Sequence, residues 1–194
     1  MRAVVSALVL GTSVVAEEPP APLPDFATCM DMELARFERA MQRLAQVPDL
    51  DPFEVGGTTD VAYCGGAGIV RCDRGSDPLP CQRDLVVEQN SLNDRVRAVL
   101  PAPQDLGDHE DALSRTLYPR LHALARGSSA GPDCAGTEAA FGTWCKAWAA
   151  NDALRVSVRT WELARYLGAV PDAVTSGWAR VPPPLRPKAR ETVD

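Results

Sequence analysis

The chain has 194 residues, of which 45% are hydrophobic and 24% are charged, and 26 acidic against 20 basic residues give a formal net charge of −6. This composition is typical of a single globular domain with short tails. It excludes collagen-like chains, coiled-coil rods, multi-pass membrane proteins and basic nucleic-acid-binding proteins.

The N-terminus has the pattern of a secretory signal peptide. Arg2 precedes a mostly apolar run that ends at Ala16, and two glutamates follow. Val14 and Ala16 supply the two positions that a signal peptidase reads, so we expect cleavage after Ala16. The alternative is a membrane anchor, but a spanning helix needs about 20 apolar residues. Residues 1–16 are therefore predicted to be a signal peptide, and residues 17–24 a loose Pro-rich segment.

All six cysteines follow this predicted signal peptide: Cys29, Cys64, Cys72, Cys81, Cys134 and Cys145. An even number of cysteines in an exported chain favours three disulfide bonds, with 15 connectivities open. Cys134 and Cys145 are the easiest pair to assign, because the Gly- and Ala-rich segment between them can fold back. The alternative is a metal site, but no spacing is C-x2-C and no histidine lies at ligand distance. We therefore expect neither a metal ion nor another cofactor.

The basic residues are almost all arginine, since only Lys146 and Lys188 are lysines. Together with abundant Ala, Pro, Val and Asp, this bias is typical of a GC-rich bacterial genome. We therefore expect a periplasmic or secreted protein of a Gram-negative bacterium. Its acidic balance would favour a basic partner.

The first predicted helix covers residues 25–46. Its apolar residues recur at steps of three and four, which places them on one helical face. They are Phe26, Met30, Leu34, Phe37, Met41 and Leu44. We interpret this face as core packing rather than as a ligand groove.

Residues 47–80 lack a helical period and are rich in Gly, Pro and Asp, so they are predicted to form a long irregular loop stapled by Cys64 and Cys72. Residues 68–72 are expected to form a short strand. Loops of this length in a compact domain are often functional. The candidate partner-binding residues are Asp49, Asp51, Phe53, Glu54, Asp60, Tyr63, Asp73 and Asp77. The alternative is a solvated loop without a partner.

Three further helical regions complete a helical domain over residues 25–168. One spans residues 81–100, and a second starts near Asp108, with a buried stripe of Leu113, Leu117, Leu121 and Leu124. Pro119 makes that second element either kinked or two short helices. A third region over residues 137–167 is rich in Trp and is expected to anchor the core, with Asn151–Asp152 as a possible break and Gly168 as its end. Residues 169–194 are predicted to be an extended, mobile Pro-rich tail. The fold class is therefore all-α, with four or five helices and one long stapled loop.

The sequence offers little for catalysis. The only histidines are His109 and His122, which point to different sides of one predicted helix, and six oxidised cysteines leave no thiol nucleophile. No G-x-S-x-G, H-E-x-x-H, S-x-x-K or Walker motif occurs. A pair of carboxylates for glycoside hydrolysis stays open, but nothing singles out two of the 26 acidic residues. We therefore expect a protein that is not an enzyme.

Two short runs, CQRDL at 81–85 and NSLNDRV at 90–96, resemble periplasmic lysozyme inhibitors of the LprI type. Cys145 and the run RTWEL at 159–163 resemble the C-terminal end of that family, so the resemblance covers about residues 81–167. This sequence has Gln89 where the family usually has an acidic residue, and Val96 where it has a tyrosine. The resemblance implies a small, helical, disulfide-linked protein that inhibits a basic cell-wall lytic enzyme.

The sequence therefore favours an exported, non-catalytic binding protein, with lysozyme inhibition as its most concrete form. In that form, the acidic loop over residues 47–80 would block the enzyme and steer the encounter. The alternative is a structural or accessory envelope protein that binds another exported or membrane subunit through its Trp-rich helix and Pro-rich tail. A cell-envelope hydrolase is a third hypothesis.

Overall fold

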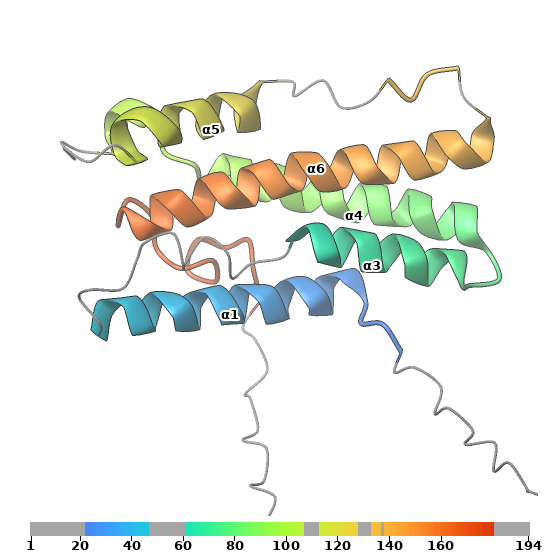
Figure 1. Cartoon of the computed structure of the whole chain (residues 1–194), viewed down its shortest axis with the longest axis horizontal. Helices are drawn as coiled ribbons and strands as arrows, with labels where there is room; N and C mark the ends of the chain where they lie inside the picture. Colours follow the sequence, from blue (N-terminus) through green and yellow to red (C-terminus); the bar gives the residue numbers. More distant parts are fainter. Residues whose placement is uncertain (1–21, 47–60, 107–112, 128–132, 137, 181–194) are drawn as a thin grey trace, which may run out of the picture.

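The computed structural model describes residues 22–46, 61–106, 113–127, 133–136 and 138–180, and the helices dominate these ranges (Figure 1). The described α-helices are α1 (Phe26–Gln46), α3 (Val61–Asp73), α4 (Pro78–Ala98), α5 (Tyr118–Arg126) and α6 (Ala139–Tyr166). A 3-10 turn at Pro103–Asp105 and a π-helical turn at Leu113–Leu117 precede α5. The predicted all-α fold is confirmed, and the predicted signal peptide lies outside the described residues.

Helix α6 is the element on which the other helices assemble. Figure 1 shows α5 along one side of α6, with α3 and α4 along the other side and α1 beyond them. In the C-terminal half of α6, Trp161 contacts Phe37 of α1 and Trp178 of the segment that follows, with ring centroids 5.7 and 4.8 Å away. The core therefore forms around α6.

Helix α1 has the bounds and the buried face that its sequence predicts. The buried apolar residues of its stripe are Phe26, Met30, Leu34 and Phe37. Asp25 caps the helix, because its carboxylate accepts hydrogen bonds from the Thr28 backbone N–H at 2.8 Å and the Thr28 hydroxyl at 3.0 Å. This bond satisfies one of the free donors in the first turn, and it also lowers the pKa of Asp25.

Replacing this cap should destabilise the protein in a pH-dependent way. Because folding lowers the pKa of Asp25, the stabilisation is present above the unfolded-state pKa and is lost as pH falls through the folded-state pKa. Asp25→Ala should therefore cost about 1 kcal/mol of unfolding free energy at pH 7. The difference from wild type should shrink below about pH 4, which urea unfolding at several pH values can measure. Asp25→Asn, an uncharged cap, should retain most of the stability; an equal loss in both variants would contradict the capping role.

Residues 61–73 form helix α3, although the sequence predicts an irregular loop over residues 47–80 and a strand over 68–72. Both expectations are wrong for this segment. Its glycines give it a poor intrinsic helix propensity, at about 1 kcal/mol each relative to alanine. The helix forms because it buries one face among its neighbours and because disulfides fix it through Cys64 and Cys72.

The glycines of α3 let it approach two other helices closely. A Cβ on Gly65 would lie 2.0 Å from the side-chain oxygen of Asn151 in α6, and a Cβ on Gly68 would lie 3.0 Å from Leu85 in α4. Asn151 is fully buried, and its side-chain amide donates to the Ala62 carbonyl of α3 at 3.4 Å. Glycine is therefore required at position 65 by space rather than by backbone conformation.

A matched pair of alanine substitutions tests this close approach. Gly65→Ala should lower the unfolding free energy by about 1–3 kcal/mol, because the buried Asn151 has little room to move. Gly66→Ala should be neutral or stabilising, since its Cβ would meet Trp148 at an ordinary 3.6 Å. Denaturant unfolding of both variants measures the difference, and similar behaviour of the two would show that α3 and α6 are not so close.

The second half of the bundle departs from the prediction in two helices. Pro119 lies in the first turn of α5, directly after the π-helical turn, so the predicted helix from Asp108 is interrupted here, although residues 107–112 lie outside the described residues. Tyr118 and Ala125 are the buried residues of α5, whereas Leu117 and Leu124 are exposed, so the predicted leucine stripe is wrong.

In α6, no break occurs at Asn151–Asp152, because Asn151 bonds to α3 instead of capping a helix.

Residues 169–180 pack on the core, so the predicted extended tail is wrong for this stretch. Gly168 ends α6 as predicted, with a φ of 73°, and the Ala169 N–H bonds to the Ala164 carbonyl at 2.9 Å. Asp172 then organises a turn by accepting hydrogen bonds from the Thr175 backbone N–H at 2.9 Å and hydroxyl at 2.7 Å. This turn places Trp178 in the core. Residues 181–194 lie outside the described residues.

The six cysteines form three disulfides, as predicted. Cys29–Cys64 joins α1 to α3, Cys72–Cys81 joins α3 to α4, and Cys134–Cys145 holds residues 133–136 against α6. The predicted pairing of Cys134 with Cys145 is confirmed. Structural disulfides persist in oxidising compartments, so they indicate a protein outside the cytoplasm. None of the helices in the described ranges combines the length and the apolar character that crossing a membrane requires.

Candidate functional site

The Trp-rich helix divides into a buried half and an exposed half. Leu154, Val158 and Trp161 are fully buried, as expected for a core anchor. Phe141 and Trp144, nearer the start of α6, are 55% and 40% exposed. The predicted role of this region in the core is therefore confirmed for only part of it.

Three aromatic residues in the first half of α6 form a continuous row, in which Phe141 and Trp144 are exposed and Trp148 is half-buried. Phe141, Trp144 and Trp148 follow one another at three and four residues, so they lie on one side of the helix. Phe141 stacks on Trp144 with ring centroids 5.4 Å apart, and Trp144 meets Trp148 edge-on at 6.0 Å. Ring-to-ring contacts of this kind restrict the rotation of the side chains but leave their exposed faces accessible to a partner.

Helix α3 extends this row on its own surface. A Cβ on Gly66 would lie 3.6 Å from Trp148, so this side of α3 borders the aromatic row. Tyr63 lies three residues before Gly66 and is 50% exposed, and Val70 lies four residues after it and is 40% exposed. We call the surface formed by Phe141, Trp144, Trp148, Tyr63 and Val70 the aromatic face.

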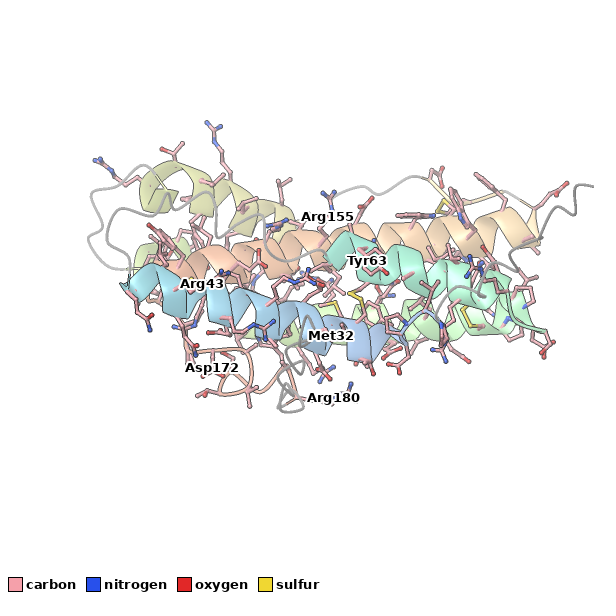
Figure 2. All side chains as sticks on the ribbon, turned by 60° about the horizontal axis from the view of Figure 1, so that its bottom comes forward. Met32, Arg43, Tyr63, Arg155, Asp172 and Arg180 are labelled. Carbon is pink, nitrogen blue, oxygen red and sulfur yellow. A yellow bond between two sulfur atoms is a disulfide. The ribbon has the colours of Figure 1, made fainter. Side chains whose placement is uncertain are left out.

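Charged groups border the aromatic face near Tyr63. Figure 2 shows Tyr63 of α3 and Arg155 of α6 projecting from neighbouring helices. Arg155 forms an exposed ion pair with Asp152 at 3.3 Å, which contributes little to stability in water. The face therefore has an apolar middle and a polar edge, as protein interfaces have.

The structure brings together few of the sequence-predicted partner-binding residues. Asp49, Asp51, Phe53, Glu54 and Asp60 lie outside the described residues. Tyr63 and Asp73 lie near opposite ends of α3, about 15 Å apart along the helix axis, but Asp73 follows Val70 of the aromatic face by one helical turn. Asp77 lies in the turn that leads into α4.

The turn between α3 and α4 is a separate, rigid feature. The Cys72–Cys81 disulfide closes it, and the Gln82 side-chain amide donates to Asp73 at 2.6 Å. Asp77 accepts from the Ser76 hydroxyl at 3.4 Å. Asp73 and Asp77 are exposed, but Arg71 and Arg74 are exposed beside them. Within the described residues, the turn is therefore not a purely acidic surface.

The described titratable side chains fit structural roles. The Tyr118 hydroxyl donates to the Pro101 carbonyl at 2.8 Å, and burial raises the pKa of Tyr118 to about 12. His122 packs beside the Tyr118 ring at 5.8 Å, and burial, followed by the charge of Arg126, lowers the pKa of His122. His109 lies outside the described residues. Among the described side chains, no cluster of three or more His, Cys, Asp or Glu could hold a metal ion.

The residues compared with lysozyme inhibitors divide between the interior and the surface of the bundle. Leu85, Leu92 and Asn93 are buried in α4, the helix that packs along α6, as are Gln89 and Val96, the two positions that depart from the family pattern. The polar residues between them are exposed. Trp161, in the run at 159–163, is fully buried. The buried positions therefore concern the fold rather than a binding surface.

No protein-family model, curated protein or solved structure matches this chain. The resemblance to lysozyme inhibitors of the LprI type thus stays a prediction.

The sequence predicts only part of the aromatic face, the candidate functional site. On an ideal helix, Trp144 lies within about 40° of Val158 in the core stripe of α6, so periodicity alone does not separate exposed from buried aromatic residues. Gly65, which lets α3 approach Asn151 of α6, is what brings Tyr63 and Val70 beside the row, and this contact depends on the tertiary fold.

Proposed function

We propose that this is an exported, non-catalytic binding protein whose protein partner docks on the aromatic face. The observation that carries the proposal is the stack of Phe141 on Trp144, two large aromatic side chains that stay substantially exposed. Aromatic residues are enriched in protein interfaces, and Trp and Tyr dominate the binding energy of many of them. A contiguous exposed apolar surface on a small domain commonly marks such an interface.

Rigidity supports this proposal. Cys134–Cys145 holds residues 133–136 against the first turns of α6, and Cys29–Cys64 fixes α3 through α1. The two helices that carry the aromatic face are therefore held in place before any partner arrives. Preorganisation of this kind reduces the entropy lost on binding.

The proposed location is the periplasm or the extracellular space of a Gram-negative bacterium. The pattern of residues 1–16 supports export through a cleaved signal peptide. The three disulfides support an oxidising compartment. In that setting, the alternative drawn from the sequence, an accessory protein that binds another exported or membrane subunit through its Trp-rich helix, agrees best with the exposed Phe141 and Trp144.

Site-specific photo-crosslinking in the native cell tests the docking surface. A photoreactive phenylalanine analogue at position 141 in α6, or at position 63 in α3, should give the same crosslinked product, because both positions belong to one face. The matched control is position 87 in α4, where Val87 is also well exposed. Trp144→Ser should abolish the product by weakening affinity about thirtyfold or more, with little change in stability. Equal products at positions 141 and 87, or none at 141 and 63, would contradict the proposal.

Inhibition of a basic lysozyme-type enzyme is a second candidate, supported by the exposed Asp73 and Asp77 on a disulfide-closed turn. A rigid turn that carries carboxylates can enter a cationic cleft and can steer the encounter. In this form, the partner would contact the end of α3 at Asp73, opposite to the end that carries Tyr63.

The salt dependence of the association rate tests this second candidate, inhibition of a lysozyme-type enzyme. The association rate with lysozyme-type enzymes should fall steeply between about 20 and 300 mM salt. The double substitution Asp73→Asn with Asp77→Asn should slow association at low salt, whereas Asp105→Asn, a charge loss in the 3-10 turn, should not. Stopped-flow or surface-binding kinetics measures both. Absence of binding at every salt concentration would rule out the inhibitor form and leave the docking proposal to the crosslinking experiment.

A further inference from the structure

The aromatic face contains a short, ridged row of rings on α6. Phe141 and Trp148 are seven residues apart, so the row extends about 10 Å along the helix. The ring planes are tilted by 30° between Phe141 and Trp144 and by 67° between Trp144 and Trp148. No planar ligand can therefore lie flat on all three rings. A narrow, rod-shaped segment that packs between the ridges fits the row better.

A polyproline II helix has the length and the chemistry that this row fits. One turn has three residues and rises about 9 Å, close to the length of the row. Its backbone carbonyls have no internal donors. Trp144 is 40% exposed, and its indole N–H has no acceptor among the described residues, so it can donate to such a carbonyl. Aromatic surfaces bind proline-rich segments because the proline rings pack on them and little backbone entropy is lost.

The chain itself contains a segment of this kind. Residues 182–187 have the sequence PPPLRP, and we call them the proline run. Proline fixes φ near −65°, which is close to the backbone conformation of polyproline II. The proline run lies outside the described residues, and its sequence alone predicts this conformation.

The charge of the proline run also favours it as a contact between two molecules. Two copies of an acidic chain repel each other unless a basic part of one faces the other. Residues 181–190 contribute +3 to the net charge of −6, so the rest of the chain carries −9. Near the row itself both signs occur, since Glu138 is exposed one turn before Phe141 and Arg74 is exposed beyond Val70. The attraction is therefore long-range and is not fixed by a single ion pair.

The chain leaves the bundle far from the row of rings. Trp178 packs on Trp161 with ring centroids 4.8 Å apart. Trp161 lies 17 residues after Trp144, which is about 25 Å along α6. Two residues after Trp178, Arg180 forms an ion pair with Asp31 of α1 at 2.6 Å. The last described residues are therefore held near the other end of α6.

The proline run cannot lie along the row of its own molecule. Pro184 is six residues beyond Trp178, a span of at most about 22 Å in a fully extended chain. This is less than the distance along α6 to Trp144. Figure 2 shows Arg180 and Tyr63 on opposite sides of α1, so the chain would also have to pass around that helix. An occupant with this sequence must therefore come from a second molecule.

We propose that the proline run of one molecule docks on the aromatic face of a second copy of this chain. This inference rests on the proposed docking role of the aromatic face, and it names the partner of that face. The three consecutive prolines cover the rings of α6, and the Trp144 indole N–H donates to a backbone carbonyl of the run. Each molecule offers one run and one face, so two copies can exchange their runs.

Binding of a peptide to the purified full-length chain tests the recognition of proline. A fluorescent peptide of residues 181–190 should bind with a dissociation constant below about 1 mM in anisotropy titrations. Replacing its three consecutive prolines by serine should weaken binding about tenfold, because the free peptide then loses more backbone freedom. In the chain, Trp144→Ser should weaken binding about tenfold or more. Val87→Ser, a matched change at an exposed position of α4, should leave binding unchanged.

A second peptide from the same chain separates the charge from the prolines. Residues 17–24 have the sequence EEPPAPLP, which is rich in proline and carries two negative charges. At about 20 mM salt, this peptide should bind at least fivefold more weakly than residues 181–190. The difference should shrink at about 300 mM salt. Equal binding of the two peptides at low salt would contradict the proline run as the occupant.

Self-association of the intact chain tests the second copy as the partner. In sedimentation velocity at about 0.5 mM, the wild-type chain should form dimers or larger species. The Trp144→Ser variant keeps its run, whereas the triple variant Pro182→Ser, Pro183→Ser and Pro184→Ser keeps its aromatic face. Each variant should be monomeric alone, and a mixture of the two should associate, because one intact run meets one intact face. Melting temperatures report whether the variants fold.

Several outcomes would overturn this inference. They are absence of peptide binding at millimolar concentration, unchanged binding in Trp144→Ser, a monomeric wild-type chain, and a mixture of folded variants that stays monomeric. A dimer that persists in the triple serine variant would indicate direct contact between two aromatic faces and would overturn it as well. In the crosslinking experiment, the inference predicts a product with the mass of two copies of the chain. A product with a different protein would overturn it while supporting the docking proposal, so the two failures are distinguishable.

Discussion

The packing of Trp161 is the contact on which the rest of the structure depends. Its fully buried ring touches Phe37 of α1 and Trp178 of the C-terminal segment, and so joins three parts of the chain that are distant in sequence. Aromatic side chains bury more area than other residues and gain from edge-on contacts. One residue of α6 therefore sets the positions of α1 and of the turn at residues 171–180.

The length of α6 explains why one helix serves both the core and the surface. Its 28 residues span about 42 Å, and α5 and the C-terminal segment cover only part of this length. Phe141 and Trp144 lie near its start, beyond those elements, and α3 borders them on one side only. Aromatic residues that continue the buried stripe therefore reach solvent, and the disulfide at Cys145 keeps this end of the helix ordered.

The elements that the sequence predicts correctly are those with a strong local signal. Helix α1 has an apolar stripe, a capping Asp25 and a following proline, and Gly168 ends α6 with the expected backbone conformation. Helix α3 escapes prediction because its sequence is rich in glycine and its stability comes from contacts with α4, α6 and two disulfides. The burial of Trp178 escapes prediction for the same reason, since its partner Trp161 lies 17 residues earlier in the chain. For the candidate sites, the sequence predicts an acidic chain with a Trp-rich helical region, but only the tertiary arrangement separates the exposed from the buried aromatic residues.

The disulfide pattern has a consequence for how the chain acquires its fold. Every bond joins two cysteines that follow each other directly among the six: the first with the second, the third with the fourth, and the fifth with the sixth. A chain that enters an oxidising compartment N-terminus first can close each pair as soon as its second cysteine emerges, before the next cysteine is available to compete. Of the 15 connectivities, this is the one that strictly sequential oxidation produces. Oxidation in this order would form the three native bonds directly, without an isomerase to correct mispaired bonds.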